Sequence, residues 1–303
     1  MRIAITGATG LIGAALAQSL SDDGIDVIRL VRRPPAGAGE VRWDPGAEAG
    51  GLRAESLAGV DALVHLSGAP VAGGRWTDDR KRELRASRID STTALVRAVL
   101  SAPQRPPVLL VASAIGWYGD TGDREVDESA PAGHGFLADL VRDWEAATKP
   151  AADAGVRVVN LRSGIVLSRR GGMLKPLLLP FRLGLGARIG PGTQYLSWIS
   201  IEDHVGACRF LLAANQLSGP VNLTAPTPVT NAEFTAALAR QLHRPAPFVV
   251  PAALVRTALG ELSGELLSSS RVRPARLEQA GFAFRYPQIG PAMTAALADG
   301  SAK

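Results

Sequence analysis

The sequence contains very little cysteine: Cys208 is the only one among 303 residues. A single cysteine excludes an intrachain disulfide framework and any metal site built from several thiolates. The four histidines also lack the spacing of metal ligands, so we predict no metal site. Cys208 lies in the apolar stretch 205–212, which is typical of the buried side of a helix, and a core residue is favoured over a reactive thiol.

Lysine is scarce as well, with only four among the 33 basic residues. The net charge of +5 and the pI of about 9.9 would suit a nucleic-acid partner. The arginines are scattered, however, and form no basic stripe interleaved with aromatic residues. We therefore predict no nucleic-acid partner, and a modest positive field equally suits a polyanionic cofactor.

Long hydrophobic runs are absent. No uncharged stretch reaches the roughly 18 apolar residues that a membrane-spanning helix needs, and the nearest one, 173–185, is interrupted by two basic residues and two prolines. The first residues already have the pattern of a strand, which does not fit a secretory leader. These observations predict a cytoplasmic protein with no membrane partner.

Strand and helix patterns alternate along the first half of the chain. Near-continuous apolar runs, typical of strands buried on both faces, occur at 2–6, 25–31, 61–67, 108–113 and 156–161. Helical patterns separate them, notably at 79–100 and 135–154. This order predicts an α/β fold with a doubly wound, parallel Rossmann sheet.

The texture changes after residue 167, where glycine and proline become frequent, and the earlier pattern returns at 196–224. We predict a dinucleotide-binding domain formed by 1–166 and 196–224. A smaller, mainly helical lobe on the substrate side would comprise 167–195 and 225–303.

Three glycines, Gly7, Gly10 and Gly13, lie between the first strand and the first helix. In this context the first allows a tight turn, the second lets a pyrophosphate approach the backbone, and the third allows the helix to pack closely on the sheet. The free amides of the helix N-terminus, around Thr9, Leu11 and Ile12, would bind the phosphates. A merely tight strand–helix turn is the alternative.

The end of the second strand carries the sequence Val31-Arg32-Arg33-Pro34. An NAD-binding fold places a carboxylate near this position to bind the ribose 2′-hydroxyl. A guanidinium such as that of Arg32 can instead pair with a 2′-phosphate. The sequence therefore favours NADP(H), although a solvated arginine is also common in so arginine-rich a chain.

Several longer stretches resemble one protein family. Asp61-Ala-Leu-Val-His-Leu-Ser-Gly-Ala69, Ser113-Ala-Ile-Gly-Trp-Tyr-Gly119 and Trp198-Ile-Ser-Ile-Glu-Asp203 are similar to extended short-chain dehydrogenase/reductases. More closely, the chain resembles their atypical "epimerase family" branch, which is nucleoside-diphosphate-sugar epimerase-like and has a C-terminal domain of unknown function. The resemblance covers essentially the whole chain.

The resemblance implies further cofactor contacts. Leu66, Ser67, Gly68 and Ala69 would line the adenosine and pyrophosphate side. The positions of Glu83, Arg88 and Arg162 match others implicated in NADP binding in that branch. Each of these three side chains could instead be a surface charge or lie on the face of a helix.

Reductases and epimerases of this kind use a tyrosine with a lysine four residues later for proton transfer. No such pair exists here: Leu137 and Val141 stand where the two residues are expected. The remaining candidates are Ser113 and Tyr118, although the alignment through Tyr118-Gly119 places Ala114 at the serine position. Tyr118 could equally belong to a turn that leaves the strand. Asp127 and Glu128 are interpreted as solvated loop charges.

Two functions remain open. The first is an NADP(H)-dependent oxidoreductase or epimerase acting on an unknown small substrate, and reduction survives the loss of the tyrosine better than epimerisation does. The second is a catalytically silent NADPH-binding regulatory or scaffold protein. A monomer or a homodimer is expected.

Overall fold

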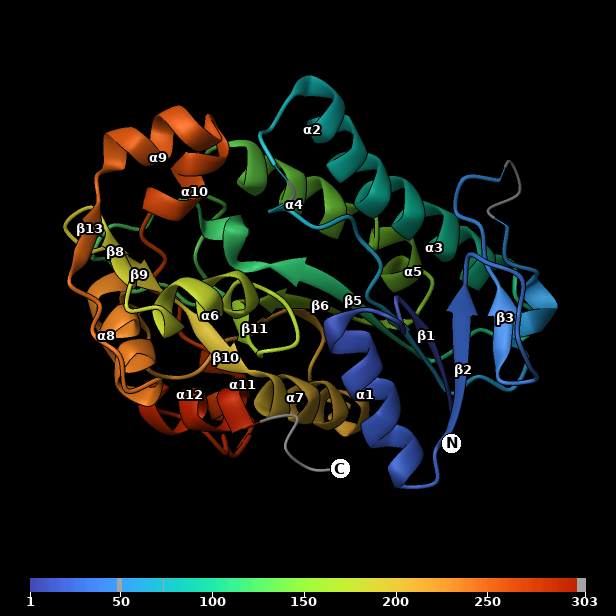
Figure 1. Ribbon diagram of the computed structural model, residues 1–303. Helices are drawn as coiled ribbons and strands as arrows, with labels where there is room; N and C mark the ends of the chain where they lie inside the picture. The colour runs from blue at the N-terminus through green and yellow to red at the C-terminus, as the bar shows by residue number, and fades with distance from the viewer. Residues whose placement is uncertain (48–50, 73, 299–303) are drawn as a thin grey trace.

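The computed structural model describes residues 1–47, 51–72 and 74–298. Its centre is a seven-stranded sheet with the order β11-β6-β5-β4-β1-β2-β3, in which all neighbouring strands are parallel (Figure 1). The strands are β1 (Arg2–Thr6), β2 (Asp26–Val31), β3 (Glu40–Arg42), β4 (Ala62–His65), β5 (Val108–Ala114), β6 (Arg157–Ser163) and β11 (Gly219–Leu223).

Helices cover both faces of this sheet because successive apolar side chains of each strand point to opposite sides. In β1, Ile3 and Ile5 pack against α1 (Leu11–Asp22) and α7 (Ile201–Ala213), whereas Ala4 packs on the opposite face. That opposite face is covered by α3 (Ser91–Ser101), α4 (Phe136–Ala146) and α5 (Lys149–Asp153). The doubly wound Rossmann architecture predicted from the sequence is confirmed.

Two predicted helices differ in detail. The helical pattern at 79–100 forms α2 (Asp78–Arg85) and α3, joined by a π-helical turn at Ala86–Asp90. The pattern at 135–154 is divided into α4 and α5, which begins just before Pro150. Cys208 is fully buried in α7, as the apolar setting indicated, and burial raises the pKa of its thiol to about 12.

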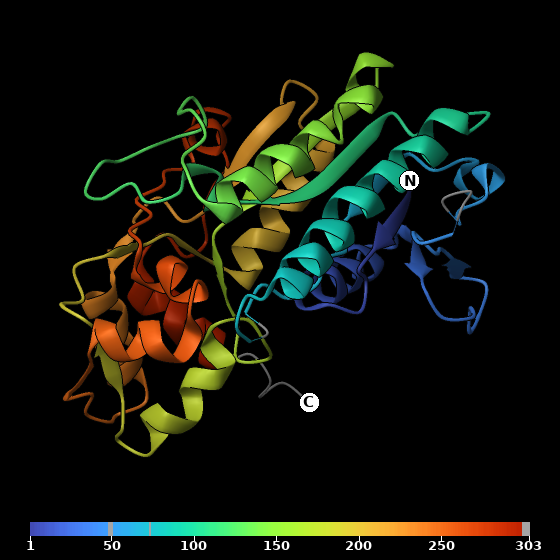
Figure 2. The same cartoon turned by 90° about the horizontal axis from the view of Figure 1, so that it is seen from above.

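The C-terminal lobe has a core of its own, built from residues such as Leu174, Phe181, Phe234 and Met293. It lies at the end of the molecule opposite β3 (Figures 1 and 2). Its elements are α6 (Leu174–Arg182), β8 (Ala187–Ile189), β9 (Tyr195–Leu196), β12 (Val229–Thr230), α8 (Asn231–Gln241), β13 (Phe248–Val250), α9 (Ala252–Leu259), α10 (Leu262–Leu267) and α12 (Ile289–Ala298).

Shorter elements connect the lobe to the main sheet. The strands β7 (Ile165–Leu167) and β10 (Trp198–Ser200) pair in parallel, and α11 (Ala275–Gln279) contacts β11. A second connection joins α2 to α9 and α10: Lys81 forms an ion pair with Glu261, and the Arg75 guanidinium donates to the Thr257 carbonyl. Cofactor-side and lobe elements are thus held together across the carboxyl edge of the sheet.

Within residues 1–47, 51–72 and 74–298, no helix is long and apolar enough to cross a membrane. Over the same ranges, no group of three or more histidine, cysteine or acidic side chains is arranged to hold a metal ion.

Candidate dinucleotide site

The turn between β1 and α1 has the backbone geometry of an anion site. Gly7 has φ +66°, and a Cβ there would lie 2.7 Å from the Leu66 carbonyl oxygen. A Cβ on Gly13 would collide with the Gly7 carbonyl, so glycine at both positions lets the helix start directly against the sheet. Gly10 caps the helix without a side-chain hydrogen bond, and the first turn carries no acidic residue.

The α1 N-terminus therefore has free amides, beginning at Leu11 and Ile12, beside the exposed Thr9. Helix N-termini of this kind bind phosphate through the amides and the positive end of the helix dipole. The residues present fit a dinucleotide's pyrophosphate.

Arg32 and Arg33 follow β2 and differ in their contacts. The Arg33 guanidinium makes two hydrogen bonds to the Glu40 carboxylate, at 2.7 and 2.6 Å. The exposed Arg32 side chain has no hydrogen bond or ion pair within the part of the chain that the structure describes. Arg33 neutralises the carboxylate of β3, and Arg32 is left available for an anion at the carboxyl end of β2.

Arg88 lies behind the loop that follows β4. Its guanidinium is only 8% exposed and donates to the Ala69 carbonyl at 2.9 Å and the Leu84 carbonyl at 3.3 Å. Burial lowers its pKa to about 10, so the group stays charged at neutral pH. No carboxylate pairs with it among the described residues, and its guanidinium lies 5.2 Å from the centre of the Trp144 ring. Its hydrogen bond to the Ala69 carbonyl supports the loop that carries Leu66, Ser67, Gly68 and Ala69.

Glu83 is placed differently from Arg88. It is exposed on α2 and forms an ion pair with Arg80. Arg80 also donates to the Pro70 carbonyl. Glu83 therefore acts on the β4 loop through Arg80, and its own contact with a cofactor stays a prediction.

A buried polar network occupies the carboxyl ends of β5, β6 and β11. Ser113 on β5 and Asn222 on β11 are both in register with Arg162 on β6, so the three side chains point to one face. Arg162, 2% exposed, forms a two-pronged ion pair with Glu145 of α4, with both distances 2.8 Å. The Ser113 hydroxyl donates to the same carboxylate at 2.6 Å.

Tyr118 completes this network from the 3-10 turn η3 (Ile115–Tyr118). Its hydroxyl is 2.8 Å from the Asn222 side-chain oxygen and accepts from Arg162 at 3.1 Å. The residue is 3% exposed, and burial raises its pKa to about 12 despite the neighbouring Arg162. Ser113 and Tyr118 thus belong to one network, in which each forms a hydrogen bond with one member of the buried Arg162–Glu145 ion pair.

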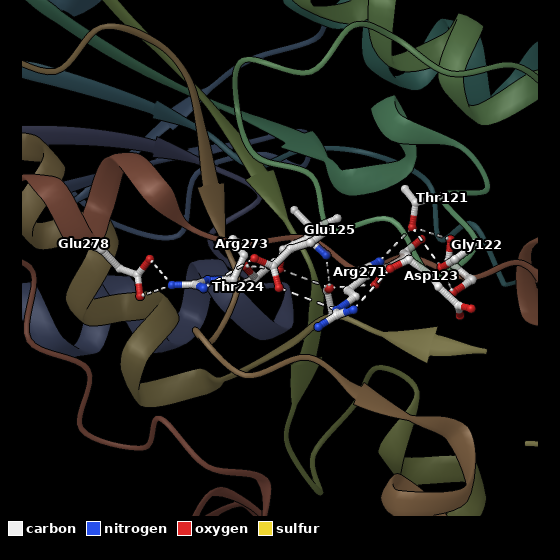
Figure 3. Close-up of polar contacts among 12 residues, drawn as sticks. Thr121, Gly122, Asp123, Glu125, Thr224, Arg271, Arg273 and Glu278 are labelled. Atoms are coloured by element: carbon white, nitrogen blue, oxygen red, sulfur yellow. Dashed lines mark hydrogen bonds and ion pairs between the residues drawn. The ribbon is translucent and has the colours of Figure 1, made fainter. Parts of the chain in front are cut away.

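The loop after Tyr118 is fastened to the C-terminal segment. Val126 and Val272 form a β-bridge, and Glu125, Arg271, Arg273 and Glu278 form a chain of ion pairs beside it (Figure 3). Glu128 is half-buried and accepts the backbone amide of Asn222 at 2.9 Å, with that of Arg276 also within reach. Burial raises its pKa, so the interpretation of Glu128 as a solvated loop charge is wrong.

Comparison of the sequence with known families gives two matches. Residues 3–223 match the NAD dependent epimerase/dehydratase family, and residues 250–296 match a domain of unknown function, DUF1731. The chain belongs to this epimerase/dehydratase family.

The similarity to curated relatives covers nearly the whole chain. An epimerase family protein of Mycobacterium tuberculosis is 50% identical over 96% of both chains. The human epimerase family protein SDR39U1 is 37% identical over 97% of this chain and 98% of its own.

Solved structures agree with this assignment. The human SDR39U1 structure with NADPH has a TM-score of 0.89 at 34% identity, covering 99% of this chain and 100% of that one. A nucleoside-diphosphate sugar epimerase from Corynebacterium glutamicum has a TM-score of 0.80 at 39% identity, covering 98% of this chain and 58% of that one.

Leu137 and Val141 are the residues aligned with the tyrosine–lysine pair from the sequence alone, and this alignment stays a prediction. Leu137 packs against Gly116 of the 3-10 turn η3 (Ile115–Tyr118), and Val141 is buried in α4. Neither side chain can exchange a proton.

Sequence reasoning missed the roles of Glu145 and Asn222. Asn222 is a polar residue near the end of the apolar strand β11, which was the available signal, whereas Glu145 lies on α4 and its approach to Arg162 depends on helix placement.

Proposed function

We propose that the protein is an NADP(H)-dependent oxidoreductase that reduces a small substrate held between the sheet edge and the C-terminal lobe. The observation that carries this proposal is the combination of an uncapped α1 N-terminus with an unpaired Arg32 at the end of β2. The first suits a pyrophosphate and the second a 2′-phosphate. The NADPH present in the human SDR39U1 structure supports the same choice of cofactor.

Each cofactor residue has a distinct task in this proposal. Gly10 keeps side chains away from the diphosphate, Gly7 and Gly13 let α1 start directly against the sheet, and the amides around Thr9, Leu11 and Ile12 bind the diphosphate. Leu66, Ser67, Gly68 and Ala69 form the opposite wall, with Arg88 supplying positive charge behind them. Arg162 acts from within its ion pair with Glu145, by fixing the ends of β5 and β6 that face the nicotinamide.

The nicotinamide, when bound, supplies the hydride. Reduction then needs one proton delivered to the product, whereas epimerisation needs a base that works in both directions. A site with Leu137 and Val141 in place of tyrosine and lysine therefore fits reduction better than epimerisation. Ser113 and Tyr118 stay candidates for the donor only if the network opens when substrate binds.

The test is NADPH oxidation against a panel of aldehydes and ketones, with NADPH affinity measured in parallel by fluorescence. Turnover of at least one carbonyl compound at a rate above the protein-free control is expected. Failure to bind either nicotinamide dinucleotide would overturn the proposal.

A second function, a catalytically silent NADPH-binding protein, is favoured by one specific observation. Ser113, Tyr118 and Arg162 are all buried in a network whose hydrogen bonds are already made. Tight NADPH binding without turnover of any compound in the panel would select this function.

A further inference from the structure

Exposed apolar side chains gather on the C-terminal lobe. Apart from Met1, every exposed large hydrophobic residue in the described part of the chain lies in α6, the turn after it, β13 or α9. Leu179 and Leu183 are 67% and 65% exposed. We call this set the lobe patch; its members are Leu179, Leu183, Leu185, Phe248, Val249 and Leu254.

The elements that carry the lobe patch are joined by hydrogen bonds. The Arg244 guanidinium donates to the Arg182 carbonyl at 3.0 Å, which joins the turn before β13 to the end of α6. β13 then pairs with β8, and the Gly190 amide donates to the Val250 carbonyl just before α9 begins. Figures 1 and 2 both show these elements together at the lobe end of the molecule.

The exposed leucines are not needed to form the core of the lobe. Leu174, Leu178 and Phe181 of α6 already fill the lobe core. Leu179 on the outside of α6, and Leu183 and Leu185 in the turn after it, are additional to these core residues. Apolar side chains collected in this way on a surface indicate a contact site.

The charge around the patch is mainly positive. Residues 168–201 and 234–260 contain eight arginines and lysines and no aspartate or glutamate. Glu233 and Glu261 lie directly beyond these ranges, and Glu261 is paired with Lys81. Arg182, Arg188 and Arg256 are exposed beside the patch. By contrast, residues 1–167 contain 21 acidic and 19 basic residues, so the positive charge of the protein is concentrated in the part that carries the patch.

Protruding leucines surrounded by cations suit an anionic lipid surface, where the leucines enter the acyl boundary and the arginines meet the headgroups. A symmetric contact between two copies would place the same positive surface against itself. Nucleic acid would use aromatic side chains for stacking, and Phe248 is the only one in the patch. We propose that the lobe patch docks the protein on the surface of a bilayer that contains anionic glycerophospholipids.

This proposal revises the expectation of no membrane partner. That expectation considered only helices able to span a bilayer, and surface docking requires none. It is also independent of the proposed redox function, because the patch lies outside the residues assigned to the dinucleotide.

The test is co-sedimentation of the full chain with vesicles of phosphatidylcholine alone or with about 30% phosphatidylglycerol. Binding to the anionic vesicles alone is expected, and it should weaken when the salt is raised to about 0.5 M. The double variant Leu179→Ser/Leu183→Ser and the double variant Arg182→Glu/Arg256→Glu should each weaken binding at least about tenfold. Unchanged unfolding midpoints will show that these variants remain folded.

The matched control is Arg53→Glu/Arg97→Glu, which makes the same change of charge on exposed positions of the main domain and should bind like the wild type. No binding to anionic vesicles, or equal weakening by the control, would overturn the proposal. A dimer that the leucine variant converts to a monomer, without vesicle binding, would assign the patch to self-association. Retention by duplex DNA or by an acidic protein, with no vesicle binding, would likewise overturn it.

Discussion

Arg32 is the residue whose predicted role is easiest to isolate, because the structure gives it no competing partner among the described residues. We expect Arg32→Glu to weaken NADPH binding by about tenfold to a hundredfold, the loss expected for a charge-assisted hydrogen bond, with little effect on NADH. Titration of each dinucleotide by fluorescence measures both affinities. Arg97→Glu on α3 is the charge-matched control, and equal losses for NADPH and NADH would remove Arg32 from the 2′-phosphate site.

The contacts of the Tyr118 side chain indicate a positioning role. Tyr118→Phe would leave the Asn222 side-chain oxygen without its donor inside a buried network. We expect the free energy of unfolding to fall by about 1–3 kcal/mol, while NADPH affinity stays unchanged. Urea denaturation and cofactor titration measure the two quantities. An unaltered stability together with lost turnover would instead identify the hydroxyl as the proton donor.

At the scale of single elements, the start of α1 depends on the absence of a side chain at Gly13. A Cβ there would overlap the Gly7 carbonyl, so Gly13→Ala must displace the helix from the turn. We expect a loss of about 1–3 kcal/mol in stability, as for other overpacked sites, and weaker binding of both dinucleotides.

Gly264→Ala in α10 is the matched control, because open space surrounds its Cβ position and its φ is ordinary. It should leave cofactor binding unchanged and keep or slightly increase stability. If Gly13→Ala behaves in the same way, the close approach of α1 does not decide binding.

The sequence predicted the elements of the main sheet well, because β1, β4 and β5 are apolar enough to be recognised without their neighbours. The break between α2 and α3 was not predictable from periodicity: the π turn shifts the helix around Arg88, whose guanidinium reaches the Ala69 carbonyl. The candidate site likewise has one part that could be predicted from the sequence and one part that could not. The glycine turn is a local feature, whereas the Ser113–Glu145–Arg162 contacts depend on strand register and helix placement.

At the scale of the whole molecule, two buried histidines connect stability to pH. Desolvation holds the pKa of His65 at about 3 and that of His204 at about 4, so both are neutral in the folded protein. Below about pH 6.5 the unfolded chain takes up protons that the folded one does not. The free energy of unfolding should therefore fall by about 1.4 kcal/mol per pH unit for each histidine until the pH approaches its folded pKa.

Urea denaturation between pH 7 and 5 measures this slope. His204→Gln, which cannot take up the proton, should reduce the average slope over this interval by about 1 kcal/mol per pH unit, because the unfolded imidazole is only partly protonated at pH 7. The same change at the exposed His134 serves as control and should leave it unaltered. An unchanged slope for His204→Gln would mean that other groups govern the acid sensitivity.

The bridge between Val126 and Val272 also has a consequence for how the polypeptide is made. The loop that leaves β5 finds its partners in a segment synthesised almost 150 residues later. A nascent chain that has emerged only as far as β11 already contains every strand of the central sheet, yet Asn222 still lacks the Arg273 carbonyl. The contacts of Val272 and Arg273 with Val126 and Asn222 can therefore form only after all seven strands of the central sheet have been synthesised.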